Sequence, residues 1–150
     1  MFFYWLIAVV VAVDQATKIL ALQKLSPDIS VSVIPRVLDF TLVMNRGVAF
    51  GLFSQHRVIL LGVITLSLIV LAVLLFYLRK KNPSKTRSLD LWAFSLILGG
   101  AIGNWIDRLR FSAVVDFIDF RVWPVFNVAD IAISVGVGLY FIYAFKRKDI

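Results

Sequence analysis

Several polar and ionisable side chains stand inside stretches that are otherwise apolar. The first of these stretches carries Asp14 and Lys18, four residues apart, a spacing that puts both side chains on one face of a helix. Ionisable groups in an apolar helix are usually paired or functional. Two interpretations of this pair stay open: it neutralises itself and locks the helix to its neighbours, or it supports a reactive site beside it.

A second polar group lies in the segment 99–108, Gly-Gly-Ala-Ile-Gly-Asn-Trp-Ile-Asp-Arg. Gly99 and Gly103 have the spacing of closely packed membrane helices. Asn104 and Arg108 share one helix face, and the guanidinium is a permanent cation with five donors suited to a carbonyl or a carboxylate. The alternative for Arg108 is a side chain that extends to the membrane surface without a reactive role.

Two further carboxylates come near the end of the chain. Asn127 and Asp130 are three residues apart and share a helix face. If that helix begins near residue 125, Asp130 lies about 7 Å below the membrane rim at ~1.5 Å per residue, where a carboxylate is protonated, paired or catalytic. Asp116 precedes this helix in a short connection. It is either a solvated loop acid or an acid that its apolar neighbours hold at the membrane surface.

Two carboxylates that meet in a poorly solvated pocket cannot both ionise cheaply, so that one keeps a proton while the other stays charged. This arrangement is typical of aspartic proteases. The charged member takes a proton from the attacking water, and the protonated member hydrogen-bonds the carbonyl oxygen and assists the departing amine. Asn45, Asn104, Asn127 and Arg108 would supply donors that hold the substrate.

The residue types that are missing narrow the chemistry further. The chain has no cysteine, which removes thiol nucleophiles and Cys-ligated metals, and its only histidine is His56. A three-histidine metal site is therefore excluded, and a Ser-His-Asp triad would require a serine beside His56. We predict neither a cofactor nor a metal, and we expect hydrolytic chemistry to rest on aspartates.

The composition indicates which helices carry these polar groups. Hydrophobic residues make up 61% of the 150 residues, which excludes an ordinary soluble domain. Four apolar blocks are long enough to cross a hydrocarbon core of about 30 Å. The prediction is a single all-α polytopic membrane domain, residues 1–150, with four transmembrane helices at about 2–22, 58–78, 89–109 and 125–145. The first block lacks a basic N-terminal region and contains Asp14 and Lys18, so we expect a retained helix and not a signal peptide.

Basic residues predict the orientation of these helices. Eight of the 16 Lys and Arg residues lie in two short segments, 79–88 and 146–150, whereas only six lie in the fifty positions of 23–57 and 110–124. The positive-inside rule then puts both termini in the cytoplasm. Because the basic clusters lie at helix ends, we interpret them as signals of membrane orientation and not as a nucleic-acid-binding surface.

The two outward connections differ in pattern. Residues 31–34 and 38–44 nearly alternate between apolar and polar, which predicts two short strands on either side of Pro35. The segment 45–51 has two glycines around apolar residues and predicts a turn at the membrane surface. Residues 110–124 are predicted to be a short outer connection.

The polar residues singled out above map to the outer half of this arrangement. They come from three of the four spans and both outer connections, which predicts one site built between helices. These residues are Asp14, Lys18, Asn45, Asn104, Arg108, Asp116, Asn127 and Asp130.

Taken together, five segments resemble the lipoprotein signal peptidases (signal peptidase II) over nearly the whole chain. They are, in order, 14–18 (Asp-Gln-Ala-Thr-Lys), 45–51 (Asn-Arg-Gly-Val-Ala-Phe-Gly), 99–108, 114–119 (Val-Val-Asp-Phe-Ile-Asp) and 126–130 (Phe-Asn-Val-Ala-Asp). The resemblance implies a four-helix aspartyl endopeptidase of the bacterial plasma membrane, with its active site near the outer face. Such an enzyme cuts diacylglyceryl-modified prolipoproteins on the N-terminal side of the modified cysteine.

The same resemblance implies roles for individual residues. The catalytic pair falls on Asp116 and Asp130, while Asp14 with Lys18 supports the first helix. Outer loops form a small extracytoplasmic sheet and a short helix that cradle the substrate. The partners are lipid-modified prolipoproteins and membrane lipids, and the expected state is a monomer. The residues that line the substrate site are Asn45, Asn104, Arg108 and Asn127.

Two other classes of protein compete with this prediction. A small transporter or channel subunit would also bury Asp, Lys and Arg, but its sites should lie near the bilayer midplane. A scaffold without catalytic activity would use the polar residues only to pack helices. A peptidase assay on the purified protein separates all three.

Overall fold

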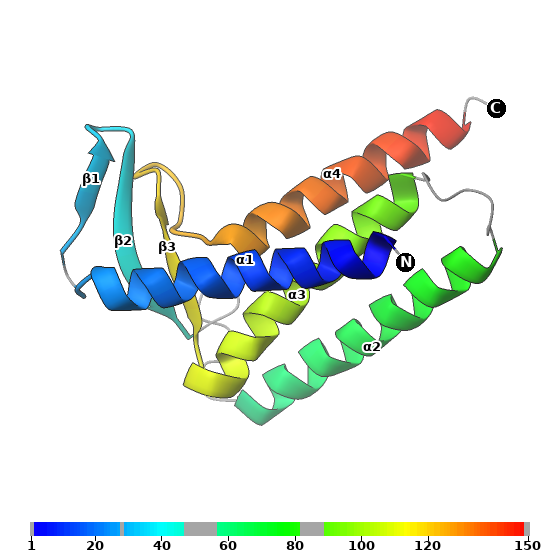
Figure 1. Cartoon of the computed structure of the whole chain (residues 1–150), viewed down its shortest axis with the longest axis horizontal. Helices are drawn as coiled ribbons and strands as arrows, with labels where there is room; N and C mark the ends of the chain where they lie inside the picture. Colours follow the sequence, from blue (N-terminus) through cyan, green and yellow to red (C-terminus); the bar gives the residue numbers. More distant parts are fainter. Residues whose placement is uncertain (1, 28, 47–56, 82–88, 149–150) are drawn as a thin grey trace.

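Four helices form a bundle with a small sheet at one end (Figure 1). The computed structural model describes residues 2–27, 29–46, 57–81 and 89–148. The elements are α1 (Phe2–Lys24), β1 (Val31–Ile34), β2 (Leu38–Asn45), α2 (Arg57–Lys81), α3 (Leu89–Phe111), β3 (Val114–Asp119) and α4 (Val128–Lys148). The turn predicted over 45–51 lies outside the described residues from residue 47 onward.

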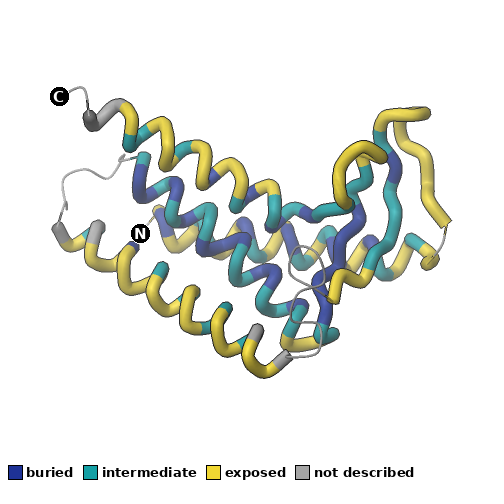
Figure 2. Tube along the Cα trace, turned by 180° about the vertical axis from the view of Figure 1, so that it is seen from behind, coloured by how far each residue is buried: buried dark blue, intermediate teal, exposed yellow. Residues whose placement is uncertain are grey.

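The outer faces of the bundle are apolar. Large hydrophobic side chains are exposed along the helices, such as Val58 and Leu66 on α2 and Trp5 on α1. Figure 2 shows exposed residues along the outer sides of the helices. Three helices, α1, α3 and α4, are long and apolar enough to cross a membrane, and α2 has a shorter apolar stretch, Leu61–Tyr77. An apolar exterior of this extent fits contact with lipid. The protein is a mostly helical, multi-pass membrane protein.

Helix α3 lies at the centre and packs against α1, α2 and α4. Two of its glycines allow these close approaches, because a Cβ at Gly100 would collide with the carbonyl oxygen of Ala129 on α4. A Cβ at Gly103 would collide in the same way with the carboxylate of Asp14 on α1. The glycines whose spacing predicts helix packing, Gly99 and Gly103, therefore lie against α1, with Gly99 beside the Cβ of Val10. Gly100 brings α3 close to the backbone of α4.

The sheet is antiparallel, in the order β1-β2-β3. Strands β1 and β2, which their alternation predicts, pair as a hairpin, and β2 then pairs with β3, so that Val43 lies opposite Asp116. The register of β2 shifts between Phe40 and Val43. Strand β3 is the link between α3 and α4, and the sheet thereby attaches directly to two helices.

Two sequence expectations about this region are wrong. Residues 110–124 are not only a connection, because they contain β3, whose residues from Val114 to Phe117 are all buried. The fourth helix begins at Val128 and not near 125, since Phe126 pairs with Ile118 of β3 and Asn127 caps the helix. Asp130 is consequently the third residue of α4 and lies nearer the helix start than expected.

The interior of the bundle changes character along its length. At the end away from the sheet, the core is a hydrophobic cluster that includes Phe3, Leu75, Leu91 and Leu98. Toward the sheet, the buried side chains of α1 and α3 are polar or charged, among them Lys18 and Asn104. The polar interior and the sheet thus meet at one end of the molecule.

Candidate active site

Asn127 and Asp130 form reciprocal hydrogen bonds at the start of α4. The backbone N–H of Asp130 donates to Asn127 Oδ1 at 3.0 Å, and the backbone N–H of Asn127 donates to Asp130 Oδ2 at 3.2 Å. This is the capping-box arrangement, with an aspartate in the position that usually holds Glu or Gln. The first turn of α4 therefore fixes the orientation of the Asp130 carboxylate, and the helix dipole there stabilises a negative charge.

Asp116 lies on β3 and is held by two amide groups. Asn127 Nδ2 donates to Asp116 Oδ1 at 2.6 Å, and Asn45 Nδ2, from the end of β2, donates to Asp116 Oδ2 at 3.0 Å. Only 2% of Asp116 is exposed. Burial raises the pKa of Asp116 to about 6, and the negative charge of Asp130 adds to this rise, while the amide hydrogen bonds oppose it.

Asn127 thus contacts both carboxylates, one through its side chain and one through its backbone. Asp116 and Asp130 both become negative when they ionise, and like charges repel. Ionising both carboxyl groups at once is therefore costly in a buried site. Two carboxyl groups in this relation can share one proton, which gives the site a general base and a general acid together.

Asn104 is oriented by a cation behind it. Lys18 Nζ donates to Asn104 Oδ1 at 2.9 Å, and Asn127 Nδ2 donates to the same oxygen at 3.1 Å. Because the amide has one oxygen, its nitrogen must point the other way, and Nδ2 donates to Asp130 Oδ1 at 2.8 Å. Lys18 therefore determines which end of the Asn104 amide faces the carboxylate.

The ammonium of Lys18 is almost completely buried and uses all three of its donors. Besides Asn104, it contacts Asp14 Oδ2 at 2.9 Å and Asp107 Oδ2 at 2.8 Å. Each carboxylate also accepts a backbone N–H, from Ala129 of α4 at 2.9 Å for Asp14 and from Val115 of β3 at 3.0 Å for Asp107. The cluster therefore ties α1 and α3 to the elements that carry Asp130 and Asp116.

Gln15 was not singled out from the sequence, and Asp107 was noted in the polar segment 99–108 without being assigned to the site. Gln15 Nε2 donates to Asp107 Oδ1 at 3.0 Å, to Gly103 O at 3.2 Å and to Asp14 Oδ2 at 3.2 Å. A signal for Asp107 was its position three residues after Asn104, on the same helix face. For Gln15 the sequence offers no such signal, since two of the three acceptors of its Nε2 lie about ninety residues away along the chain.

Arg108 lies beside the carboxylates without a hydrogen bond to them among the described residues. Its Nη1 donates to the backbone oxygen of Asn104 at 3.2 Å, and its charge interacts with those of Asp116, Asp130 and Asp107. The guanidinium is partly exposed. It is placed to attract a carbonyl oxygen or a negative charge toward the pair.

All eight residues selected from the sequence meet in this region, which joins the ends of α1, β2 and α3 to β3 and the start of α4. Among the described residues no group of three or more His, Cys, Asp or Glu side chains could hold a metal ion. The chemistry available from the described groups is acid–base chemistry between two carboxyls, with amides and one guanidinium as donors.

Comparisons with known proteins agree with one another. The family profile described as "Signal peptidase (SPase) II" matches residues 6–146. The chain is 37% identical over 147 residues to the "Lipoprotein signal peptidase" of Halothermothrix orenii, which covers 98% of this chain and 97% of that protein. It is 43% identical over 139 residues to the protein of the same name from Pelotomaculum thermopropionicum, covering 93% and 88%.

A solved structure is similar as well. It is described as a bacterial membrane enzyme determined by the in meso method at 2.3 Å resolution, and it superposes with a TM-score of 0.83 at 31% identity. The match covers 98% of this chain and 89% of that one. A second bacterial membrane enzyme, at 1.9 Å resolution, gives a TM-score of 0.74 at 32% identity, covering 97% and 93%.

Proposed function

Because this chain belongs to the signal peptidase II family of proteases, which cleave signal peptides from prolipoproteins, we propose that Asp116 and Asp130 are its catalytic pair. The observation that carries this proposal is the double contact of Asn127. Its side chain donates to Asp116 at 2.6 Å and its backbone donates to Asp130 at 3.2 Å. Asn127 thereby fixes the position of the buried carboxyl group of Asp116 relative to the half-buried carboxyl group of Asp130.

The proposed reaction is an aspartyl hydrolysis in which the pair shares one proton. We place this proton on Asp116, because its burial raises its pKa to about 6. Asp130 is then the base that takes a proton from a water molecule as that water attacks the scissile carbonyl. Asp116 donates a hydrogen bond to the carbonyl oxygen and then transfers its proton to the departing amine.

The surrounding donors would stabilise the charge that develops on the substrate. Arg108 has a partly exposed cation beside the pair, and a preorganised cation near a developing oxyanion lowers the barrier to its formation. Asn45, Asn104 and Asn127 hold the carboxyl oxygens in position. Asp14 and Lys18 act through Asn104 and the ends of β3 and α4, and they do not touch the substrate.

We further propose that the chain acts as a monomeric domain of the bacterial plasma membrane, with four spans, both termini in the cytoplasm and the active site near the outer face. The sheet at that end cradles the substrate. Cleavage occurs on the N-terminal side of a cysteine that carries a diacylglyceryl group. The two acyl chains hold the scissile bond at membrane depth. Enzyme and substrate then meet by diffusion along the membrane surface and not through solution.

The experiment that tests the catalytic pair compares three variants of the purified protein in liposomes with a lipid-modified precursor. Asp116→Asn and Asp130→Asn should each reduce turnover by at least ~10³-fold, since an amide keeps the shape but cannot shuttle the proton. Asp119→Asn is the matched control, because Asp119 is on the same strand and bonds Thr41 and the backbone of Arg121. An essential Asp119 with a dispensable Asp116 would reject the assignment.

A separate experiment tests the dependence on lipid. Matched precursors with and without the diacylglyceryl group are compared at equal concentration in the membrane. The modified precursor should be cleaved much faster, because its acyl chains hold the scissile carbonyl at the depth of the carboxyl pair. Equal rates would overturn the lipid dependence and indicate a general intramembrane aspartyl protease.

A further inference from the structure

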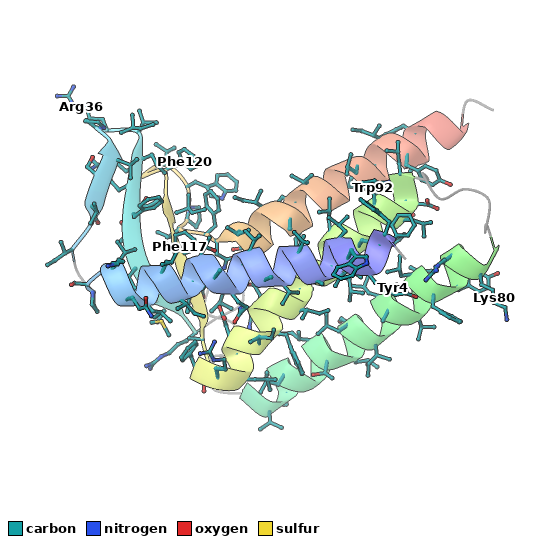
Figure 3. All side chains as sticks on the ribbon, in the orientation of Figure 1. Tyr4, Arg36, Lys80, Trp92, Phe117 and Phe120 are labelled. Carbon is teal, nitrogen blue, oxygen red and sulfur yellow. The ribbon has the colours of Figure 1, made fainter. Side chains whose placement is uncertain are left out.

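A cavity of about 330 Å³ lies between α1 and the sheet, outside the carboxyl pair. Its α1 side is formed by Thr17, Leu20 and Ala21, with Lys24 and Leu25 at the end of the helix. Its sheet side is formed by Phe40 of β2 and Phe117 of β3, whose rings are 6.2 Å apart. Figure 3 shows Phe117 where β3 passes α1.

The lining of this cavity is unsuited to water. Five of its side chains are hydrocarbon, and the hydroxyl of Thr17 is already bonded to the backbone oxygens of Val13 and Asp14 at 2.9 Å each. The cavity is open to the surface, and its apolar walls offer water few hydrogen-bond partners in place of those in bulk solvent. A hydrocarbon chain is therefore a better occupant than solvent.

The position of the cavity brings lipid within reach. Thr17, Leu20 and Lys24 follow one another along a face of an apolar helix, and Leu20 is 55% exposed on the outer surface of the bundle. Lys24 is the last residue of α1, and it is the charged side chain among the described residues that line the cavity. A cation at the end of a span, above an apolar pocket, complements a phosphate with an attached chain.

We propose that this cavity binds one acyl chain of an anionic membrane phospholipid, with Lys24 bound to the headgroup phosphate. The occupant braces β3 and β2 against α1. This site is separate from the one where the substrate is cut, because successive residues of a strand point to opposite faces. Phe117 lines the cavity, and Asp116 beside it points to the other face, toward Asn127.

Native mass spectrometry of the whole protein in detergent micelles tests the proposal without any measurement of cleavage. The protein is titrated with phosphatidylglycerol, with phosphatidylcholine of the same chains, and with glycerol 3-phosphate as a headgroup without chains. We expect one phosphatidylglycerol to bind saturably, phosphatidylcholine to bind at least ~5-fold more weakly, and glycerol 3-phosphate to leave no bound species.

Three variants locate the binding. Lys24→Gln should weaken phosphatidylglycerol binding by about fivefold, the effect of one cation near an anionic headgroup. Lys80→Gln is the matched control, an exposed lysine at the other end of the bundle (Figure 3), and it should leave binding unchanged. Leu25→Trp and Ala21→Phe each place a larger side chain in the cavity and should abolish binding. Both variants should keep an unchanged circular-dichroism spectrum.

Three results would overturn the proposal. The first is equal binding of the two phospholipids. The second is an equal loss in Lys24→Gln and Lys80→Gln, which would indicate diffuse attraction to basic residues. The third is displacement of phosphatidylglycerol by a lipid-modified precursor peptide, which would assign the cavity to the substrate. Each result is independent of whether Asp116 and Asp130 are catalytic.

Discussion

Asn127 caps α4, links the two carboxyl groups and bonds Asn104, so that one amide serves both the helix and the site. A substitution of Asn127 that keeps the helix cap but removes the hydrogen bonds to the site can separate these two functions. A serine still caps a helix through its hydroxyl, but it is too short and has the wrong donor geometry to replace the amide hydrogen bond to Asp116.

We expect Asn127→Ala to lower the free energy of unfolding by about 1 kcal/mol through loss of the cap, and to reduce cleavage by about 10²-fold. Asn127→Ser should regain most of the stability and little of the activity. Thermal melts in detergent and the cleavage rate measure the two effects. Recovery of activity together with stability in the serine variant would mean that Asn127 acts only as a cap.

The raised pKa of Asp116 makes stability depend on pH. Its folded value of about 6 lies above the ordinary value of 3.8, and folding therefore favours the protonated carboxyl. The stabilisation is fully present below about pH 4 and is lost as the pH rises through 6, a change of ~3 kcal/mol for two units. We expect the melting temperature of the protein to fall over this range relative to that of Asp116→Asn.

The control for this measurement is Asp119→Asn, which should follow the pH dependence of the unaltered protein. Parallel curves for the protein and Asp116→Asn would mean that Asp116 titrates in the folded state as it does in the unfolded chain. Melts at four values between pH 4.5 and 7.5 are sufficient to separate the two outcomes.

At this scale the sequence predicts which polar residues gather, because an ionisable group in an apolar helix needs a partner. It does not predict the partners themselves. The bond between Asp107 and the backbone of Val115, and that between Asp14 and the backbone of Ala129, involve N–H groups, which have no sequence signature. Which oxygen of each amide faces which donor also follows only from the assembled fold.

Among the elements, α3 and α4 meet where a glycine lies against a carbonyl. A methyl group at Gly100 would collide with the oxygen of Ala129, the residue before Asp130. We expect Gly100→Ala to push the start of α4 outward, to lower the melting temperature and to reduce cleavage. Gly138→Ala is the control on α4, because nothing lies within 4 Å of its added methyl group, and it should leave both quantities unchanged or raise the melting temperature.

If Gly100→Ala and Gly138→Ala behave alike, close contact between α3 and α4 is not what positions Asp130. Activity and melting temperature should be measured on the same preparations. A lower melting temperature with unchanged cleavage in Gly100→Ala would likewise mean that the α3–α4 contact stabilises the fold but does not position Asp130.

The elements themselves differ in how well the sequence predicts them. The helices and the β1–β2 hairpin follow from long apolar runs and from alternation, which are local patterns. Strand β3 was missed because both of its faces are covered from Val114 to Phe117, and a strand buried on both sides does not alternate. The start of α4 was placed too early, since Phe126 is as apolar as a helix residue but pairs with β3.

At the scale of the whole molecule, the distribution of basic residues predicts which end faces the cytoplasm. The chain has no cysteine, and single cysteines can therefore report orientation directly. In intact cells, a maleimide that cannot cross the membrane should label Gln23→Cys, near the sheet end of α1, and leave Lys80→Cys unlabelled. Both positions are exposed in the structure. Labelling of position 80 alone would reverse the orientation and with it the proposed location of the site.

The order of the elements along the chain also has a consequence for synthesis. Asp14 and Lys18 leave the ribosome first, whereas Asp116 and Asp130 belong to the last two elements and meet only once α4 has formed its first turn. Chains emerge from their N-terminus, and every product that stops before residue 130 therefore lacks the second carboxyl group. If Asp116 and Asp130 are the catalytic pair, a nascent chain that has not yet made α4 cannot hydrolyse its neighbours in the membrane. Synthesis of the first turn of α4 then completes the proposed pair.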